Sequence, residues 1–296
     1  MQRTDWTWCP QFSPGATAAR GLRAKTRSHT CRVWPLGKGF RLMTSDAARR
    51  APALGWPLGP VAHRGLHNAG KGCIENTGSA FLAAIAKGYA IECDLQAAKD
   101  GHPVVFHDET LDRLMTVRGL VAEHTPAQLK QLTYEATADR ILTLDEFLEL
   151  VGGRVPLFIE IKTLFGAPGI FEQRIAERFK AYQGPLAAMS FDPKAVIAMR
   201  QIAPHIPRGL ISYRWDDDWM PQLPSTERQK LAALADAPEV DPSFIAYDID
   251  DLPEPAPLAL RDRTGVKLFT WTVKTPEQRE RARHYADAII FEGFEA

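Results

Sequence analysis

AIECDLQAAKDGHPVVFHD, residues 90–108, contains two short apolar runs of the kind that form buried strands, 90–95 and 103–107. Asp100-Gly101 lies between them and is a strong hairpin signal, so the two runs are expected to pair as antiparallel neighbours. A hairpin interrupts the simple alternation of strands and helices that a parallel sheet requires. This stretch therefore predicts one strand of a sheet followed by a second, irregular one.

From residue 61 onward, short apolar runs alternate with longer amphipathic runs. The other strand-like runs are 61–64, 156–161, 186–191, 208–212, 244–248, 266–273 and 288–291. The helix-like runs are 76–88, with Asn76 as a start signal, 125–132, 143–151, 169–182, 193–202, 225–237, 255–263 and 275–285. Strands separated by helices of about ten residues indicate βα units and a mostly parallel sheet.

Nine strand-like runs exceed by one the eight strands of a closed (β/α)8 barrel. One of the two runs beside the Asp100-Gly101 hairpin is therefore expected to be distorted or to lie outside a regular barrel. An open, doubly wound sheet is the competing architecture. It would usually carry a G-x-G-x-x-G loop after its first strand to bind a dinucleotide, and this motif is absent.

The charge, the apolar runs and the cysteines of the chain limit the partners and the location that we expect for it. The chain has 296 residues, 36 Lys and Arg, and 36 Asp and Glu, so its formal net charge is zero, and nucleic acid is not expected as a partner. No apolar run approaches the roughly 18 residues that cross a bilayer, so stable membrane insertion is not expected. Four widely spaced cysteines lack zinc-site spacing, and a reducing, cytoplasmic location is expected.

The first 42 residues differ from the rest, since they contain eight Lys and Arg but one acid. They lack the apolar core of a secretory signal. We interpret residues 1–56 as a basic, disordered extension, with Met43 as the natural start, and residues 57–296 as the barrel domain. An organelle transit peptide and a functional tail are the alternatives.

Acidic side chains gather near the ends of two apolar runs. Glu92 and Asp94 are two residues apart, which places both on the same strand face with Cys93 opposite, and the same rule places Glu160 and Lys162 together. Adjacent buried carboxylates need positive compensation. Hard oxygen ligands favour one divalent cation, Mg²⁺, Ca²⁺ or Mn²⁺, over Zn²⁺.

A structural network is the alternative to a metal site. In it, Arg64 and Lys162 would neutralise Glu92 and Asp94 without any metal ion. The spacing of the residues does not decide between the two.

Two histidines and two cations accompany these acids. His63 and His107 each lie at a strand end, where barrel enzymes build their active sites, and a histidine pair can act as general base and general acid. Arg64 and Lys162 suit a phosphate group. His67, His102, His124 and His205 are expected to be solvated or structural, and Asp216-Asp217-Asp218 to be a solvated loop rather than a second cation site.

The ordered set of motifs resembles the glycerophosphodiester phosphodiesterase family, in particular its small bacterial cytosolic members. The motifs are AHRG (62–65), EN (75–76), E-x-D (92–94), the run from DG to HD (100–108), EIK (160–162) and SF (190–191). LDR (111–113), LTLDEFLEL (142–150), RGL (208–210), WDDDW (215–219) and TWTV (270–273) agree with it. The resemblance covers about residues 60–291.

Membership implies a distorted TIM (β/α)8 barrel of the phospholipase-C-like phosphodiesterase type. It implies metal-dependent hydrolysis of glycerophosphodiesters to sn-glycerol 3-phosphate and an alcohol such as choline or ethanolamine. The resemblance places the roles by position. The catalytic pair falls on His63 and His107, the metal ligands on Glu92, Asp94 and Glu160, the phosphate contacts on Arg64 and Lys162, a substrate-side aromatic on Trp271, and supporting roles on Glu75 and Asn76.

The sequence departs from the family pattern near the expected barrel mouth. Lys274 follows Val273 where the family often has Asn, and Phe291-Glu292 stands where it often has Thr-Asp. These positions leave the alcohol group open. A lysophospholipase D and an inactive barrel that binds a phosphodiester are the alternative functions. Attack by water or by a glycerol hydroxyl, and the oligomeric state, are also left open.

Overall fold

The computed structural model describes residues 51–296 apart from 164, 217–219 and 221, and the described residues belong to one compact unit. The expectations for Met43, for residues 1–50 and for Asp217 and Asp218 lie outside the described residues.

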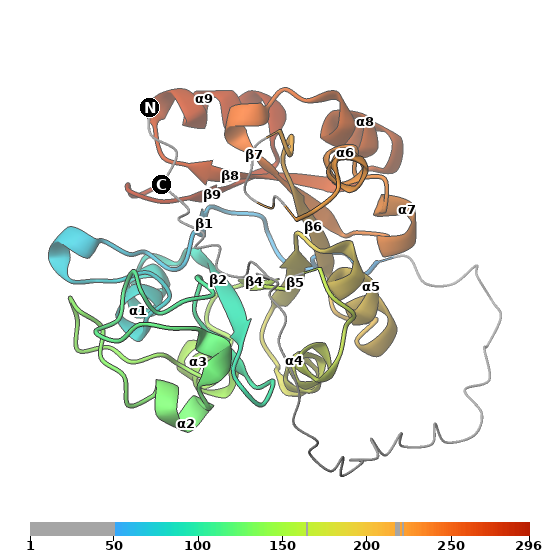
Figure 1. Cartoon of the computed structure of the whole chain (residues 1–296). Helices are drawn as coiled ribbons and strands as arrows, with labels where there is room; N and C mark the ends of the chain where they lie inside the picture. Colours follow the sequence, from blue (N-terminus) through green and yellow to red (C-terminus); the bar gives the residue numbers. More distant parts are fainter. Residues whose placement is uncertain (1–50, 164, 217–219, 221) are drawn as a thin grey trace, which may run out of the picture. The chain divides into compact units, whose positions relative to one another are not determined.

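Eight parallel strands close a barrel in the order β1, β2, β4, β5, β6, β7, β8 and β9, and β1 pairs with both β2 and β9 (Figure 1). The barrel strands are β1 Val61–Ala62, β2 Ala90–Ala97, β4 Leu157–Ile161, β5 Leu186–Ser190, β6 Arg208–Ser212, β7 Phe244–Asp248, β8 Lys267–Val273 and β9 Ala288–Phe291, and a further strand is β3 Pro103–Val105. The predicted closed barrel is confirmed, and the alternative prediction of an open, doubly wound sheet is wrong.

The additional strand is β3. It pairs antiparallel with the end of β2, with Leu95 opposite Val105, and pairs with no other strand among the described residues, so it lies outside the barrel. The Asp100-Gly101 turn makes this hairpin, as expected, and Gly101 has the positive φ of 76° that the turn requires.

Helices surround the strands in Figure 1. They are α1 Gly78–Lys87, α2 Pro126–Leu129, α3 Leu144–Val151, α4 Ile170–Ala181, α5 Pro193–Ile202, α6 Ser225–Ala232, α7 Ala237–Val240, α8 Pro255–Thr264 and α9 Pro276–Tyr285, with 3-10 turns η1 Ala69–Lys71, η2 Val121–Glu123 and η3 Ile249–Asp251. The single helix expected over 225–237 is wrong. Leu234, with φ 52°, breaks the run, and Pro238 lies in the first turn of α7, where its missing N–H costs no helical bond.

Strand alternation divides the core into two parts. Inward side chains such as Phe158, Phe244 and Phe269 fill the barrel, while outward ones such as Cys93 pack under the helices. At the amino-terminal end of the barrel, Leu54 is buried in the same interior cluster. The carboxyl ends of the strands are therefore free to carry polar residues.

Gly209 of β6 makes room for the interior aromatics. A Cβ atom at this position would overlap the ring of buried Phe244. We expect Gly209→Ala to lower the free energy of unfolding by about 1–3 kcal/mol, the usual cost of overpacking a core. Urea denaturation measures this change. Gly59→Ala is the matched control, because a Cβ there would meet no atom of the described, non-neighbouring residues within 4 Å. Equal stability of the two variants would contradict the packing argument.

Candidate active site

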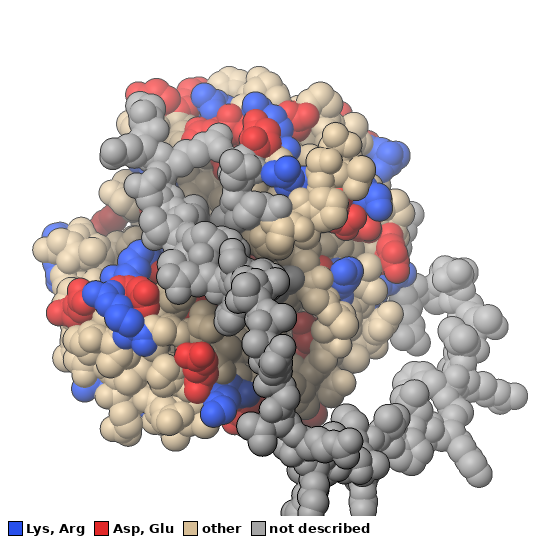
Figure 2. Space-filling model, viewed as in Figure 1, with Lys and Arg blue, Asp and Glu red and all other residues tan. Residues whose placement is uncertain are grey.

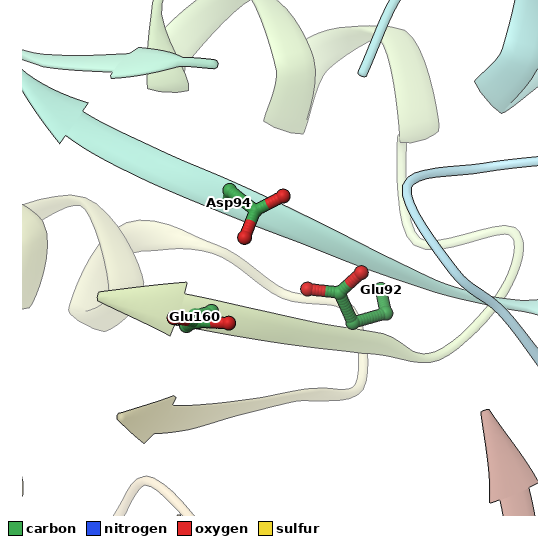
Figure 3. Close-up of side chains that lie close together, drawn as sticks. All are labelled: Glu92, Asp94 and Glu160. Atoms are coloured by element: carbon green, nitrogen blue, oxygen red, sulfur yellow. The ribbon is translucent and has the colours of Figure 1, made fainter. Parts of the chain in front are cut away.

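Three carboxylates meet at the carboxyl end of the barrel. Glu92 and Asp94 project inward from β2, and Glu160 projects from the neighbouring β4, where it is the register partner of Asp94 (Figure 3). One oxygen from each of the three lies within 4.8 Å of the others. The expected shared face of Glu92 and Asp94 is therefore confirmed, and β4 supplies the third acid by strand pairing.

Burial of the three carboxyl groups changes their pKa values. Glu92 and Asp94 are each 1% exposed, and Glu160 is 7% exposed. Burial, followed by the charges of Asp94 and Glu160, raises the pKa of Glu92 well above its usual value. Burial also raises the pKa of Glu160 to about 7, although Lys162 opposes the change. The carboxyl of Asp94 is different, because Lys162, His107 and Arg64 outweigh burial and lower its pKa.

Cationic side chains neutralise only part of the cluster. Nζ of Lys162 is 3.1 Å from Asp94 and 2.8 Å from Glu160, and Nε of Arg64 is 3.4 Å from Asp94. Glu92 instead accepts the backbone N–H of Arg64 at 2.9 Å, and its Oε1 atom is buried with no hydrogen-bond partner among the described residues. The structural network pairs Asp94 and Glu160 with cationic side chains but gives Oε1 of Glu92 no partner in the described part of the chain. The oxygen donors therefore fit a divalent cation.

The turn after β1 aims Arg64 at the acids. Arg64 and Gly65 have positive φ values of 55° and 80°, and a Cβ on Gly65 would come within 2.9 Å of Ala80. Glycine is therefore required for the chain to pass so close to α1. The resulting turn directs the backbone N–H of Arg64 to Glu92, while its guanidinium donates to Glu75 at 2.7 Å.

Asn76 hydrogen-bonds to Asp94 and does not cap a helix. Its side-chain amide donates to Asp94 at 2.8 Å, and its own backbone N–H donates to the carbonyl of Arg64 at 2.9 Å. The N-cap of α1 is Thr77, so the expected start signal at Asn76 is wrong. The physical reason is the positive φ of 56° at Asn76, which turns its side chain toward β2.

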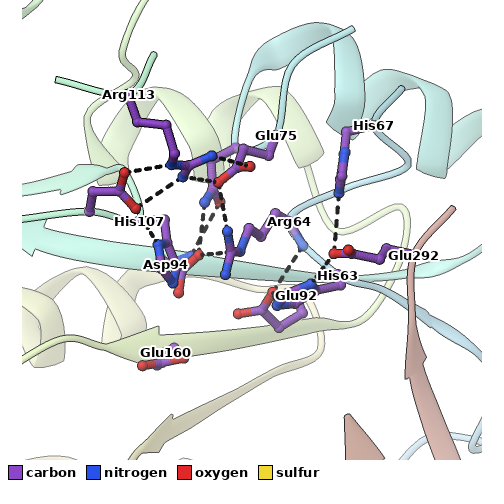
Figure 4. A network of polar contacts seen from close by, with 12 residues as sticks. His63, Arg64, His67, Glu75, Glu92, Asp94, His107, Arg113, Glu160 and Glu292 are labelled. Carbon is purple, nitrogen blue, oxygen red and sulfur yellow. Dashed lines mark hydrogen bonds and ion pairs between the residues drawn. The ribbon is translucent and has the colours of Figure 1, made fainter. Parts of the chain in front are cut away.

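His107 is held from its Nδ1 side. Nδ1 is 2.6 Å from Asp108, whose other oxygen accepts from Nε of Arg113 at 2.7 Å. Arg113 also donates to Glu75, at 2.7 and 2.9 Å (Figure 4). Burial, then Arg64 and Lys162, lower the pKa of His107 to about 3. Asp108 and Arg113 were not predicted as site residues, although the HD and LDR motifs contain them.

His63 has a matching arrangement. Its Nδ1 is 2.7 Å from Oε2 of Glu292, and its Nε2 is 3.9 Å from Glu92 (Figure 4). Nζ of Lys274 lies 2.7 Å from the other oxygen of Glu292, and Nε2 of His67 lies 3.6 Å from Oε2. The two departures from the family pattern, Lys274 and Glu292, are thus in contact. Glu292 was missed because only barrel closure brings it to His63.

Aromatic side chains form the other side of the barrel mouth. Phe191, which follows β5, contacts Trp271 of β8 edge-on, with ring centroids 5.4 Å apart, and lies 6.1 Å from Trp215. Nε1 of Trp271 donates to the carbonyl of Ala246 at 3.1 Å, which fixes the indole. The structure therefore places Trp271 in an aromatic wall, whereas the three carboxylates lie on β2 and β4, and His63 and His107 follow β1 and β3.

The outer surface carries no single dominant charge on the face shown in Figure 2, where acidic and basic side chains are interspersed. None of the helices in the described part of the chain combines the length and apolarity that spanning a bilayer demands.

Comparison with known sequences gives a consistent result. The model of the "Glycerophosphoryl diester phosphodiesterase family" matches residues 63–293. A glycerophosphodiester phosphodiesterase of Caldanaerobacter subterraneus subsp. tengcongensis is 34% identical over 232 residues, which cover 75% of this chain and 88% of the relative.

Solved structures agree on the fold. A glycerophosphodiester phosphodiesterase of Thermotoga maritima has a TM-score of 0.60 and 25% identity, over 80% of this chain and 95% of that chain. A phosphodiesterase of Oleispira antarctica, solved with the product sn-glycerol-3-phosphate, has a TM-score of 0.63 and 23% identity, over 79% and 93% of the two chains.

Proposed function

Because this chain belongs to the glycerophosphoryl diester phosphodiesterase family, and is thus a phosphoric diester hydrolase, we propose that it uses a divalent cation and two histidines to convert glycerophosphodiesters to sn-glycerol 3-phosphate and an alcohol. One observation carries this proposal. A buried triad of carboxylates, in which one oxygen of Glu92 has no hydrogen-bond partner in the described part of the chain, lies beside two histidines that each contact a carboxylate through Nδ1.

Glu92, Asp94 and Glu160 would hold the cation. When bound, Mg²⁺ or Ca²⁺, with Mn²⁺ as a further option, would supply positive charge for the phosphate oxygens in the transition state. Asn76 keeps Asp94 in place by donating to it at 2.8 Å. The oxygen-only donor set is the support for a hard cation over zinc.

His63 and His107 would move the protons. One takes a proton from the attacking hydroxyl as the new P–O bond forms, and the other gives a proton to the alcohol oxygen as its bond to phosphorus breaks. An ionised carboxylate only accepts hydrogen bonds, so Glu292 and Asp108 require a hydrogen on each Nδ1. In the histidine that acts as the base, Nε2 then carries the lone pair, and in the one that acts as the acid, Nε2 carries the proton that is transferred.

Arg64 and Lys162 would bind the phosphate. Both are largely buried beside the acids, where a cation interacts more strongly with a developing negative charge than it does in water. Arg64 can contact two oxygens of a phosphate with its planar guanidinium, whereas Lys162 provides a point charge.

Either of two nucleophiles, water or the neighbouring glycerol hydroxyl, gives a balanced reaction. Water gives glycerol 3-phosphate in one displacement, while the neighbouring glycerol hydroxyl gives a cyclic phosphate that water then opens. Phosphorus NMR during turnover separates them, because a cyclic phosphate signal appears only on the second route.

Trp271 and the aromatic wall would receive part of the substrate. The glycerol 3-phosphate product in the Oleispira antarctica phosphodiesterase supports the glycerol phosphate half as the shared element. The cytoplasmic location and the absence of nucleic-acid partners stay predictions.

Release of glycerol 3-phosphate tests the proposal. We expect the purified chain with Mg²⁺ or Ca²⁺ to release it from glycerophosphocholine and glycerophosphoethanolamine faster than it releases choline from lysophosphatidylcholine. The reverse preference would make the protein a lysophospholipase D. Tight substrate binding without product from any of the three would make it an inactive, phosphodiester-binding barrel.

A further inference from the structure

The residues that directly follow the three neighbouring strands β1, β9 and β8 lie side by side. Val61 and Ala62 of β1 pair with Ile290 and Phe291 of β9, and Phe291 pairs with Val273 of β8. The next residues along these strands are His63, Glu292 and Lys274. They stand side by side at the mouth of the barrel, at the seam where the last strand meets the first.

Glu292 is the centre of this row. Its Oε2 contacts Nδ1 of His63 and its Oε1 contacts Nζ of Lys274, both at 2.7 Å. The backbone holds the same alignment, because His63 donates its N–H to Phe291 at 2.9 Å and Glu292 donates its own to Val273 at 3.1 Å. The side chain of Glu292 is thus restrained at both oxygens and at its backbone.

The contact determines what His63 presents to the substrate. With Nδ1 donating to the carboxylate, the lone pair of the neutral ring is on Nε2, which lies 3.9 Å from Glu92. We propose that Glu292 and Lys274 form a positioning pair, in which Glu292 keeps His63 in the Nδ1–H tautomer and Lys274 keeps the carboxylate of Glu292 in place. This inference rests on the proposed function of His63.

A purely structural role makes a different prediction. The side chains of Lys274 and Glu292 are 41% and 20% exposed, and ion pairs of this exposure contribute little to folding. If the pair only joined two strands, its loss would leave turnover and the state of His63 unchanged. If it positions His63, its loss lowers kcat with little change in KM.

Kinetics on purified full-length variants test the pair. We expect Glu292→Gln to lower kcat by about 10²-fold, at the lower end of the range for a misplaced acid or base, with KM within about threefold. Lys274→Met should lower kcat about tenfold. The double variant should be no worse than Glu292→Gln, because Lys274 acts through Glu292. Glu292→Asp, which keeps a carboxylate, should regain part of the loss.

Lys267→Met is the matched control. Lys267 lies at the opposite end of β8, and its Nζ is 3.1 Å from Asp287 just before β9, so the pair joins the same two strands away from the site. This variant should keep the kcat of the unaltered protein. An unchanged kcat in Glu292→Gln, or an equal loss in Lys267→Met, would overturn the proposal.

Nitrogen NMR of ¹⁵N-histidine-labelled protein gives a second readout that needs neither turnover nor a folded variant at Glu292. At mildly alkaline pH, the His63 ring, assigned by its loss in His63→Ala, should show hydrogen on Nδ1. Hydrogen on Nε2 instead would overturn the inference. If the unaltered protein releases no glycerol 3-phosphate, the proposed function fails, and this spectrum still decides the tautomer.

Discussion

His63→Ala and His107→Ala are each expected to lower kcat by at least about 10²–10⁴-fold, the contribution of one general acid or base. Each ring would transfer a proton at a different oxygen of the phosphodiester, so neither substitutes for the other. Both rings lie at the barrel mouth, where they contact the carboxylates of Glu292 and Asp108 rather than fill the apolar interior, and their loss should leave the protein folded. Initial rates of glycerol 3-phosphate release at saturating substrate, beside circular dichroism, measure both effects.

His102→Ala is the control for these variants. His102 also contacts a carboxylate through Nδ1, Asp100 at 2.8 Å, but it belongs to the β2–β3 hairpin and is 44% exposed. The His102→Ala variant should therefore keep the turnover of the unaltered protein. Turnover close to that of the unaltered protein in His63→Ala or His107→Ala would remove that histidine from the mechanism.

Removal of the divalent cation should have an effect of similar size. A cation that stabilises transition-state charge contributes several kcal/mol, so chelation with EDTA should lower turnover at least roughly 100-fold. Added Mg²⁺, Ca²⁺ or Mn²⁺ should restore it. Glu92→Gln should weaken cation binding in calorimetric titrations, because it removes the carboxylate whose Oε1 has no other partner among the described residues.

Glu172→Gln is the matched control for Glu92→Gln, because it also removes a buried carboxylate. Glu172 is 5% exposed and accepts the N–H of Gly169 at 2.6 Å at the start of α4, a contact that glutamine also makes. It should bind the cation as the unaltered protein does. Equal cation affinity in Glu92→Gln and the unaltered protein would show that Glu92 is not a ligand.

The strands and the acid cluster could be predicted from the sequence because local patterns encode them. Successive side chains of a strand point to opposite faces, which places Glu92 and Asp94 on one face whatever the tertiary structure, and Asp100-Gly101 favours a hairpin from its turn preferences alone. The hairpin turn therefore predicts the additional strand independently of barrel closure.

The partners of the histidines depend on contacts that no local pattern contains. Glu292 lies 229 residues from His63, and only the pairing of β9 with β1 brings them together. Arg113 reaches Glu75 across 38 residues through an irregular segment. The split between α6 and α7 was missed for another reason, since Leu234 adopts a left-handed conformation that its residue type does not suggest.

The most direct test is the release of sn-glycerol 3-phosphate from glycerophosphocholine by the purified chain, with EDTA and then with excess Mg²⁺ or Ca²⁺, beside His63→Ala. The account predicts release that requires the cation and that disappears in the variant. Release that persists in EDTA, or that survives the loss of His63, would contradict it, as would a folded, cation-loaded protein that releases nothing.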